Sequence, residues 1–163
     1  MSTPQKPIKI AAVISRFNPE VTEGLLAGAR AALLEKGFTL GDEDLIRAPG
    51  AFELPLLAQA LIKTERYDGV ICLGCVVKGD TAHFEYISLG ATIGILQASL
   101  ATATPISFGI LTTYTDEQAT ARSRPDAENK GREAALACLE SVETLHKIRS
   151  FDVNRRQVGL QSG

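Results

Sequence analysis

The order of apolar and polar positions along the chain predicts four strands. Nearly continuous apolar runs are typical of parallel strands, which helices cover on both faces. Four such runs occur, and the third is the strongest: residues 8–14, 45–48, 69–77 and 106–111. The sequence therefore favours a sheet whose strands are buried on both sides.

Between these runs, apolar residues recur at the spacing of a helix. Asn18-Pro19 opens the first predicted helix, because asparagine is a good N-cap and proline suits the first helical position, and Gly37 ends it. Within it, Gly24-x-x-x-Gly28 indicates close helix packing. Pro49-Gly50 marks a turn before a second helix, and Thr115-x-x-Gln118 is a capping box that opens a short one. Longer helices are predicted over residues 81–101 and 129–149.

The predicted helix over residues 81–101 carries apolar residues on two of its faces, so we expect it to be largely buried. Burial on two sides points to a partner subunit. The two stripes are Phe84-Ile87-Ala91-Ile95-Ala98 and Leu89-Ile93-Leu96-Leu100.

Strand and helix alternate four times without repeats or low-complexity linkers. This alternation predicts an α/β fold, a flavodoxin-like three-layer sandwich with a four-stranded parallel sheet and helices on both faces. A length of 163 residues suits one domain, residues 1–163, with a single core. Residues 1–7 are predicted to form an N-terminal extension, and the polar segment from about residue 150 to 163 a mobile tail.

Overall charge and apolar content restrict the class of partner. A formal net charge of -2 gives no global electrostatic case for nucleic acid or an anionic membrane. No apolar run approaches the roughly 20 residues that span a bilayer. The first residues lack the apolar core of a signal peptide. We therefore expect a cytoplasmic protein that binds neither nucleic acid nor membrane.

The three cysteines are an odd number, which argues against a disulfide framework. Cys72 and Cys75 lie three positions apart, and in a strand such side chains point to opposite faces, so they can neither bridge nor chelate a metal. We predict that both, like Cys138 on the last helix, are small buried residues.

Ligands of parallel sheets bind beyond the carboxyl ends of the strands, where the following loops meet. Here those loops carry two aromatic rings, a carboxylate, a lysine, threonines and a histidine, a set that suits a flat polar ring and a phosphate. His83 lies in the first turn of its predicted helix, where free N–H groups favour phosphate and the helix dipole disfavours the imidazolium. A neutral imidazole there would exchange protons near pH 7.

Each candidate residue also has a plainer interpretation. His83 would also suit a surface or capping position, and loop aromatics such as Phe17 often cover the edge of a core. Glu53 would also serve as an acid in the first turn of a helix. Lys78 to Thr81 would form an ordinary turn, and the charge of Asp80 would compete with a phosphate there. No dinucleotide, Walker, nucleophile-elbow or zinc-binding spacing occurs.

Six segments carry a more specific signal through their joint order and spacing. They are Arg16-Phe17-Asn18, Pro49 to Pro55, Gly74 to Tyr86, Phe108 to Thr113, Asp116 to Ala119, and Asn129-Lys130-Gly131. Together they closely resemble the lumazine synthase family, and the likeness covers about residues 8–148.

The resemblance implies a transferase of riboflavin biosynthesis. That family condenses 5-amino-6-(D-ribitylamino)uracil with 3,4-dihydroxy-2-butanone 4-phosphate to give 6,7-dimethyl-8-ribityllumazine, without a cofactor or a metal. The resemblance assigns the pyrimidine and ribityl groups to Phe17, Ala51, Phe52, Glu53, Cys75, Val76, Val77 and Phe108. It assigns the phosphate to Asp80, Thr81 and Arg122, with Lys78 and Lys130 as further candidates. His83 would move protons.

In this family Phe108 and Arg122 come from the neighbouring subunit, so a monomer would lack a complete site. The resemblance thus implies a homo-oligomer, a pentamer or a pentamer-based assembly, with riboflavin synthase as a further partner. This chain departs from the family's usual sequence at three places. The family commonly has arginine in place of Lys78 and a small uncharged residue in place of Asp80. Its capsid-forming members have a glycine-rich, lysine-containing loop in place of Ser123 to Glu128.

Two other functions fit the same fold class. One is a non-catalytic flavin- or lumazine-binding or shell-assembly protein, which would need none of His83, Glu53 and Arg122 for ring binding. The other is a flavodoxin-like electron carrier, which would copurify with a yellow, redox-active cofactor.

Overall fold

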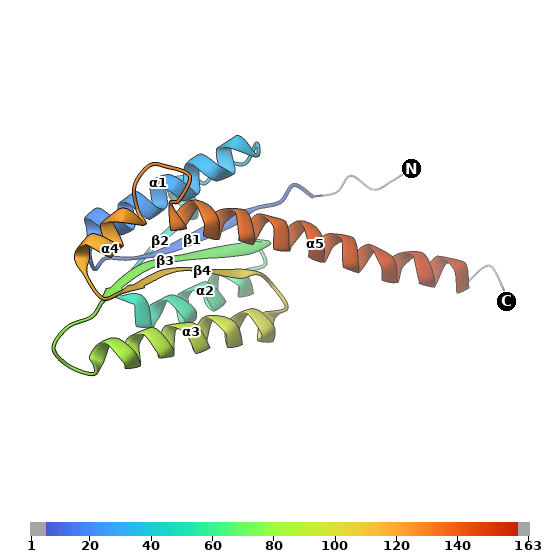
Figure 1. The fold of residues 1–163 in the computed structure, drawn as a ribbon. Coiled ribbons are helices and arrows are strands. Elements are labelled where there is room, and N and C mark those ends of the chain that lie inside the picture. The colour runs from blue at the N-terminus through green and yellow to red at the C-terminus, as the bar shows by residue number, and fades with distance from the viewer. Residues whose placement is uncertain (1–5, 160–163) are drawn as a thin grey trace.

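A computed structural model describes residues 6–159, with side chains described up to Phe151. Its centre is a four-stranded parallel sheet in the order β2-β1-β3-β4 (Figure 1). The strands are β1 (Ile10–Ser15), β2 (Leu45–Ala48), β3 (Gly69–Val77) and β4 (Ile106–Thr113). The predicted α/β fold with a parallel sheet is confirmed, although β1 begins later than predicted and β4 ends later.

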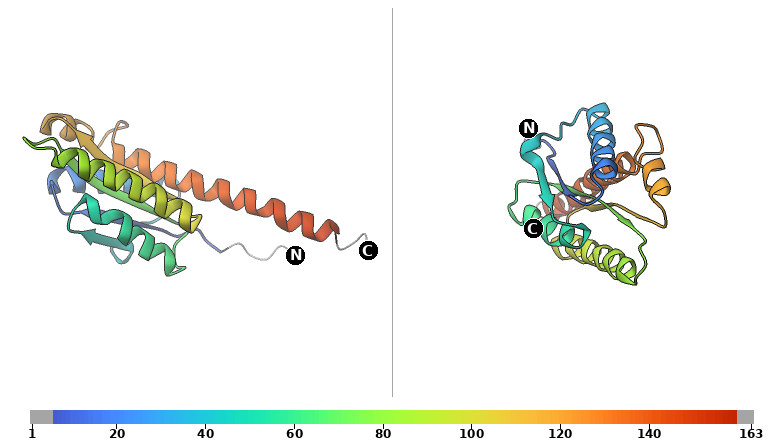
Figure 2. Two further views of the ribbon diagram at one scale, coloured as in Figure 1. Left: turned by 90° about the horizontal axis from the view of Figure 1, so that it is seen from below. Right: turned by 90° about the vertical axis from the view of Figure 1, so that its left-hand side faces the viewer.

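Helices cover both faces of the sheet (Figures 1 and 2). One face carries α1 (Pro19–Glu35), α4 (Asp116–Ala121) and α5 (Lys130–Gly159). The other carries α2 (Leu54–Lys63) and α3 (His83–Thr102), and two short 3-10 helices flank β2, namely η1 (Asp42–Asp44) and η2 (Ala51–Glu53). The predicted three-layer arrangement is therefore confirmed.

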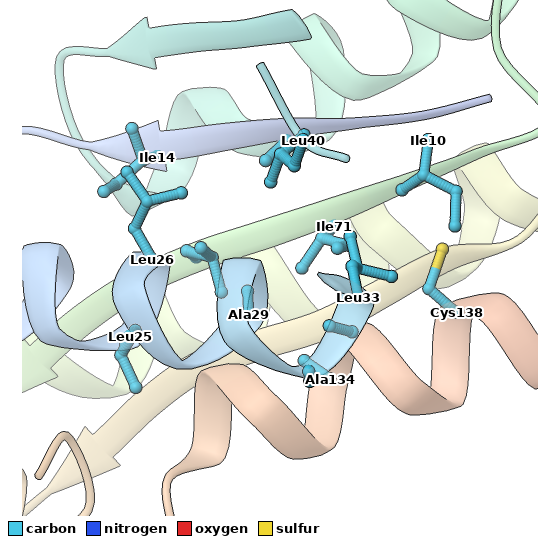
Figure 3. Packing of buried hydrophobic residues seen from close by; sticks show 14 of the residues in the cluster. Ile10, Ile14, Leu25, Leu26, Ala29, Leu33, Leu40, Ile71, Ala134 and Cys138 are labelled. Carbon is cyan, nitrogen blue, oxygen red and sulfur yellow. The ribbon is translucent and has the colours of Figure 1, made fainter. Parts of the chain in front are cut away.

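Each face of the sheet has its own core, because side chains alternate along every strand, so the predicted single core is in fact two. From β1, Ile10 and Ile14 join the core beneath α1 and α5, which is drawn in Figure 3. Val13 joins the core beneath α2 and α3. This strand is buried along its whole length, as its continuous apolar run predicted.

The cysteines follow the same alternation. Cys72 lies in the core beneath α2 and α3, whereas Cys75 and Cys138 lie in the core beneath α1 and α5. All three are free and buried, as predicted. Burial raises the pKa of the Cys75 thiol to about 11 and that of Cys138 to about 12, and it also raises the pKa of Cys72. Their thiols are therefore protonated and unreactive at neutral pH.

Local sequence signals fix two helix ends. Gly37 adopts a φ of 84° just after α1, and the N–H of Phe38 donates to the Leu33 carbonyl at 2.9 Å, which closes the helix. Before α4, the Thr115 hydroxyl accepts from the Gln118 N–H at 3.2 Å, so the predicted cap is confirmed. The Gln118 side chain reaches back to the N–H of Tyr114 at 2.9 Å.

Helix α3 is less buried than its two apolar stripes predicted. Only Ala91, Ile95 and Ala98 are buried within one chain. The second stripe, together with Tyr86, is exposed because no other element packs against it within the described part of the chain; Leu89 and Leu100 are 59% and 73% exposed. By length and composition alone, this helix would suffice to span a membrane, so the expectation that no apolar stretch is long enough is wrong.

Helix α5 runs on to Gly159 instead of ending near Arg149, so the predicted end of this helix is wrong. The physical reason is that no proline or glycine interrupts the sequence between residues 132 and 158, and polarity alone does not end a helix. The predicted mobility of the tail stays a prediction. The end of α5 projects beyond the sheet (Figure 1). Residues 1–5 of the predicted N-terminal extension and 160–163 of the predicted tail lie outside the described residues.

Candidate active site

A cleft of about 360 Å³ opens at the carboxyl ends of β1 and β3, between η2 and the start of α3. We call it the first cleft. It brings together most of the residues that the sequence assigned to a ring-binding site. It is lined by Phe17, Asn18, Gly50, Ala51, Phe52, Glu53, Cys75, Val76, Val77, His83 and Ile87.

The loop after β1 presents Phe17 to this cleft. The N–H of Arg16 donates to the Ala48 carbonyl at 3.0 Å, which continues the pairing of β1 with β2 by one residue. The next residue, Phe17, is 67% exposed. A large apolar ring held in the open at the end of a buried strand is available to stack on a flat ligand.

Asn18 holds this loop in a way that the sequence did not predict. It adopts a left-handed conformation, φ 52° and ψ 58°, which asparagine tolerates better than most residues. Its side chain does not cap α1, although Asn18 occupies the N-cap position. The Nδ2 amide instead donates to the carbonyl of Cys75 at 3.2 Å and so joins the loop to the end of β3.

Gly50 lets two candidate residues approach each other. A Cβ atom at this position would lie 3.2 Å from Oε2 of Glu53 and 3.5 Å from Cδ2 of Phe17. The carboxylate and the aromatic ring therefore flank the same glycine on one wall. Glu53 ends η2 and is half-buried, so its carboxylate is partly fixed yet open to a ligand.

Phe52 and Ala51 complete the wall that η2 forms. Ala51 is buried, whereas Phe52 is 56% exposed and lies against α3 at Gly90. A Cβ at Gly90 would lie 2.7 Å from Cε2 of the Phe52 ring, so the glycine allows α3 to approach η2 closely. This contact holds the start of α3 beside the cleft.

His83 is the first residue of α3, two residues later than the predicted start of the helix. Its side chain is exposed and lines the first cleft. The hydroxyl of Thr81 accepts a 3.4 Å hydrogen bond from the His83 N–H, so Thr81 is partly engaged with the helix start. The structure thus brings His83, Phe17 and Glu53 to one cleft.

The loop before α3 lies next to the first cleft but does not line it. Lys78, Asp80 and Thr81 are all exposed. The ammonium group of Lys78 lies 5.6 Å from the centroid of the Tyr114 ring, and the backbone N–H of Lys78 donates to the Thr113 carbonyl at 2.9 Å. The predicted phosphate residues on this loop are near His83 in the chain, but none of them lines the first cleft.

A second cleft, of about 320 Å³, lies on the outer edge of the sheet along β4 and α5. Phe108, Arg122 and Lys130 line it, so the structure brings these three predicted residues together, apart from the first cleft. Phe108 is 44% exposed. Arg122 follows α4, and its guanidinium donates to the Gln118 carbonyl at 2.9 Å; Lys130 forms an ion pair with Glu133.

Charge differs between the two clefts. The first offers one carboxylate and one imidazole, and the second two cations and the carboxylate of Glu133. Among the described side chains, no group of three or more histidine, cysteine or acidic residues is placed to hold a metal ion. The second cleft therefore offers the stronger cationic group for an anionic ligand, through the guanidinium fork of Arg122.

Comparison with known proteins points to one family. Residues 7–146 match the sequence model of the family described as 6,7-dimethyl-8-ribityllumazine synthase. The chain is 65% identical over 143 residues to 6,7-dimethyl-8-ribityllumazine synthase 1 of Caulobacter vibrioides, which covers 88% of this chain and 94% of that protein.

Two more distant relatives carry the same name. The 6,7-dimethyl-8-ribityllumazine synthase of Salinibacter ruber is 48% identical over 140 residues, covering 86% of this chain and 90% of that protein. The protein of that name from Lactiplantibacillus plantarum is 47% identical over 146 residues, covering 90% and 92%. Each match spans almost the whole length of the relative, so the likeness is not confined to one motif.

Proposed function

Because this chain belongs to the 6,7-dimethyl-8-ribityllumazine synthase family, we propose that it catalyses the condensation that gives the family its name. The substrates would be 5-amino-6-(D-ribitylamino)uracil and 3,4-dihydroxy-2-butanone 4-phosphate. The products would be 6,7-dimethyl-8-ribityllumazine, phosphate and two water molecules. The observation that carries the proposal is the first cleft, where Phe17, Glu53 and His83 line one space of about 360 Å³.

In this proposal the first cleft binds the pyrimidine substrate. Phe17 stacks on the pyrimidine ring, and the backbone of Cys75, Val76 and Val77 bonds its polar edge. The ribityl chain lies along η2, where the backbone N–H and C=O groups of Ala51 and Phe52 donate and accept hydrogen bonds and the Glu53 carboxylate accepts them. A half-buried carboxylate suits several neighbouring hydroxyl groups because it accepts at both oxygens.

The phosphate of the second substrate binds near the start of α3. The backbone N–H groups of the first turn and the helix dipole favour an anion there, close to Asp80, Thr81 and His83. Arg122 of a neighbouring subunit adds a guanidinium fork, and Phe108 of that subunit closes the ring pocket. Lys78 and Lys130 are further candidates for this anion.

The reaction then proceeds by proton transfers at one cleft. The 5-amino group of the pyrimidine attacks the ketone, and loss of water gives an imine. Phosphate leaves by elimination, and the ribitylamine nitrogen closes the second ring with loss of another water. His83 accepts and returns protons in these steps. The amine is already a competent nucleophile, so much of the acceleration comes from holding both substrates together.

We propose further that the enzyme is a homopentamer, or an assembly of pentamers, with sites shared between subunits. Three features support this. The two groups of predicted site residues lie in separate clefts of one chain. The second apolar stripe of α3 is exposed. Beside the second cleft, an apolar groove of about 630 Å³ follows the β4 edge past Leu100, Phe108 and Leu145.

The cellular setting follows from the same proposal. A cytoplasmic location would place the enzyme with its soluble small-molecule substrates. Riboflavin synthase is a proposed partner, since it would consume the lumazine product. Copurification of the two proteins, with a lysate lacking this chain as the control, would test that partnership.

One assay tests the proposed function. The purified protein is incubated with both substrates, and the appearance of fluorescent lumazine and of free phosphate is followed. We expect lumazine and phosphate in equal amounts. When either substrate is omitted, neither product should form faster than it does without the protein. Binding of lumazine or flavin without turnover would instead indicate the non-catalytic alternative. A yellow redox cofactor that copurifies with the protein would indicate the electron carrier. Light scattering on the same sample measures the oligomeric state.

A further inference from the structure

Asn129 is buried to 1% exposure at the start of α5, and its side chain makes three hydrogen bonds. The Nδ2 amide donates to the Gly24 carbonyl of α1 at 3.1 Å and to the Arg124 carbonyl at 2.8 Å. The Oδ1 atom accepts from the N–H of Arg132 at 3.0 Å. A single side chain thus joins α1, the loop between α4 and α5, and the first turn of α5.

Two glycines of α1 make room for this arrangement. A Cβ atom at Gly28 would overlap the carboxamide of Asn129, and one at Gly24 would lie 2.6 Å from the Ser123 carbonyl. The Gly24-x-x-x-Gly28 motif therefore does more than pack a helix, because it seats the loop between α4 and α5 directly on α1.

The loop that Asn129 fixes carries a cation at each end. The N–H of Lys130 donates to the Arg122 carbonyl at 2.9 Å, so the two residues close the loop from Ser123 to Asn129. Both side chains line the second cleft. Arg122 also bonds the Gln118 carbonyl, so its backbone and its guanidinium are both held.

We propose that Asn129 is a positioning residue that fixes Arg122 on the wall of the second cleft. The inference rests on the proposed function, in which that wall supplies the phosphate-binding guanidinium. Loss of the carboxamide leaves the Gly24 and Arg124 carbonyls without this donor and frees the loop. Even a small displacement of the Arg122 guanidinium would weaken phosphate binding, because its hydrogen bonds to the phosphate depend on its position.

The test compares Asn129→Ala with Arg122→Ala and with the double variant, in the full-length assembled protein. We expect Asn129→Ala to raise the KM for the butanone phosphate about tenfold. In the Arg122→Ala background the same replacement should change that KM less than about twofold, because the group through which it acts is already gone. Multiplying losses in the double variant would show a merely structural role and overturn the proposal.

A second variant reaches the same contact from α1. Gly28→Ala should push the Asn129 carboxamide aside and raise the KM for the butanone phosphate in the same direction, whereas Ala27→Ser, at an exposed position of the same helix, should not. An unchanged KM in Gly28→Ala, with the protein folded and assembled, would contradict the proposal even if Asn129→Ala does not fold.

Failure of the premise would look different. If the wild-type protein forms no lumazine, the proposed function is wrong. If the wild type is active but Arg122→Ala leaves the KM unchanged, or Asn129→Ala and Gly28→Ala both retain the wild-type KM, the proposed role of Asn129 is wrong while the function stands.

Discussion

The first and second clefts of this chain are similar in volume but lie on different parts of the sheet. The first forms where the central strands β1 and β3 end, and it carries an aromatic ring, a carboxylate and an imidazole. The second lies along the edge strand β4 and carries an aromatic ring and a guanidinium. Neither cleft of one chain contains both His83 and Arg122, so each is half of the proposed site.

The two clefts are also held differently. In the first, backbone pairing and the bond from Asn18 to the Cys75 carbonyl join neighbouring strand ends. In the second, the buried carboxamide of Asn129 joins a loop to a helix. The wall of the first cleft is therefore built from the ends of central strands, whereas the proposed contact with a second copy lies along an edge strand.

The largest expected effect tests whether the two clefts act together across subunits. Phe17→Ala/Glu53→Gln and Arg122→Ala should each lose about a hundredfold in kcat/KM, since each removes charged hydrogen bonds to substrate. Coexpression of the two variants should restore about a quarter of wild-type activity, because a ring of randomly mixed subunits assembles some sites from two intact halves.

Mixing the purified variants after separate expression, without exchange of subunits, is the control and should restore nothing. Coexpressed variants that remain as inactive as the separate ones would show that both clefts serve sites within a single chain.

The next effect concerns the imidazole of the first cleft. His83→Ala should slow turnover by about tenfold to a hundredfold, less than the loss of a fully catalytic acid, because binding both substrates together supplies much of the rate. Steady-state measurement of kcat with saturating substrates checks this. A folded, assembled His83→Ala protein with no measurable activity would contradict it.

A smaller effect concerns the wall behind the first cleft. Burial raises the pKa of Cys75 from 9 to about 11, so the native protein keeps the thiol proton that the unfolded chain loses first. The resulting stability is complete below pH 9 and is lost between about pH 9 and 11, at up to about 1.4 kcal/mol per pH unit. Urea unfolding at pH 8, 9 and 10 should show a shallower fall for Cys75→Ala than for the wild type.

The smallest effect concerns the ion pair between Arg132 and Glu35, which joins α5 to the end of α1 near Asn129. The Arg132 guanidinium holds the pKa of Glu35 below its usual value, so any stability from the pair is present above pH 4.5 and is lost as the pH falls. The pair is exposed, so Glu35→Gln should leave the melting temperature and the KM nearly unchanged at pH 7. A marked rise in KM would show that the ion pair, instead of Asn129, fixes the second cleft.

Much of the fold could be predicted from local patterns. Apolar runs identified the four strands, and the alternation of side chains placed Cys72 and Cys75 on opposite faces. The rule that parallel strands end at one edge placed Phe17, Glu53 and His83 together. Arg122 and Phe108 had to be assigned from family resemblance, because no pattern in the chain distinguishes an edge strand from a central one.

The sequence by itself determined the helices and strands, their buried faces and the loops that meet at the first cleft. The spacing of apolar residues and the capping of helices depend only on residues that are close together in the chain. Only the tertiary structure decided that Asn18 bonds Cys75, 57 positions away, and that Asn129 bonds Gly24, 105 positions away. It also set the two clefts apart and left one face of α3 uncovered by the described residues. These outcomes depend on which distant backbone groups meet in space, and no local spacing encodes that.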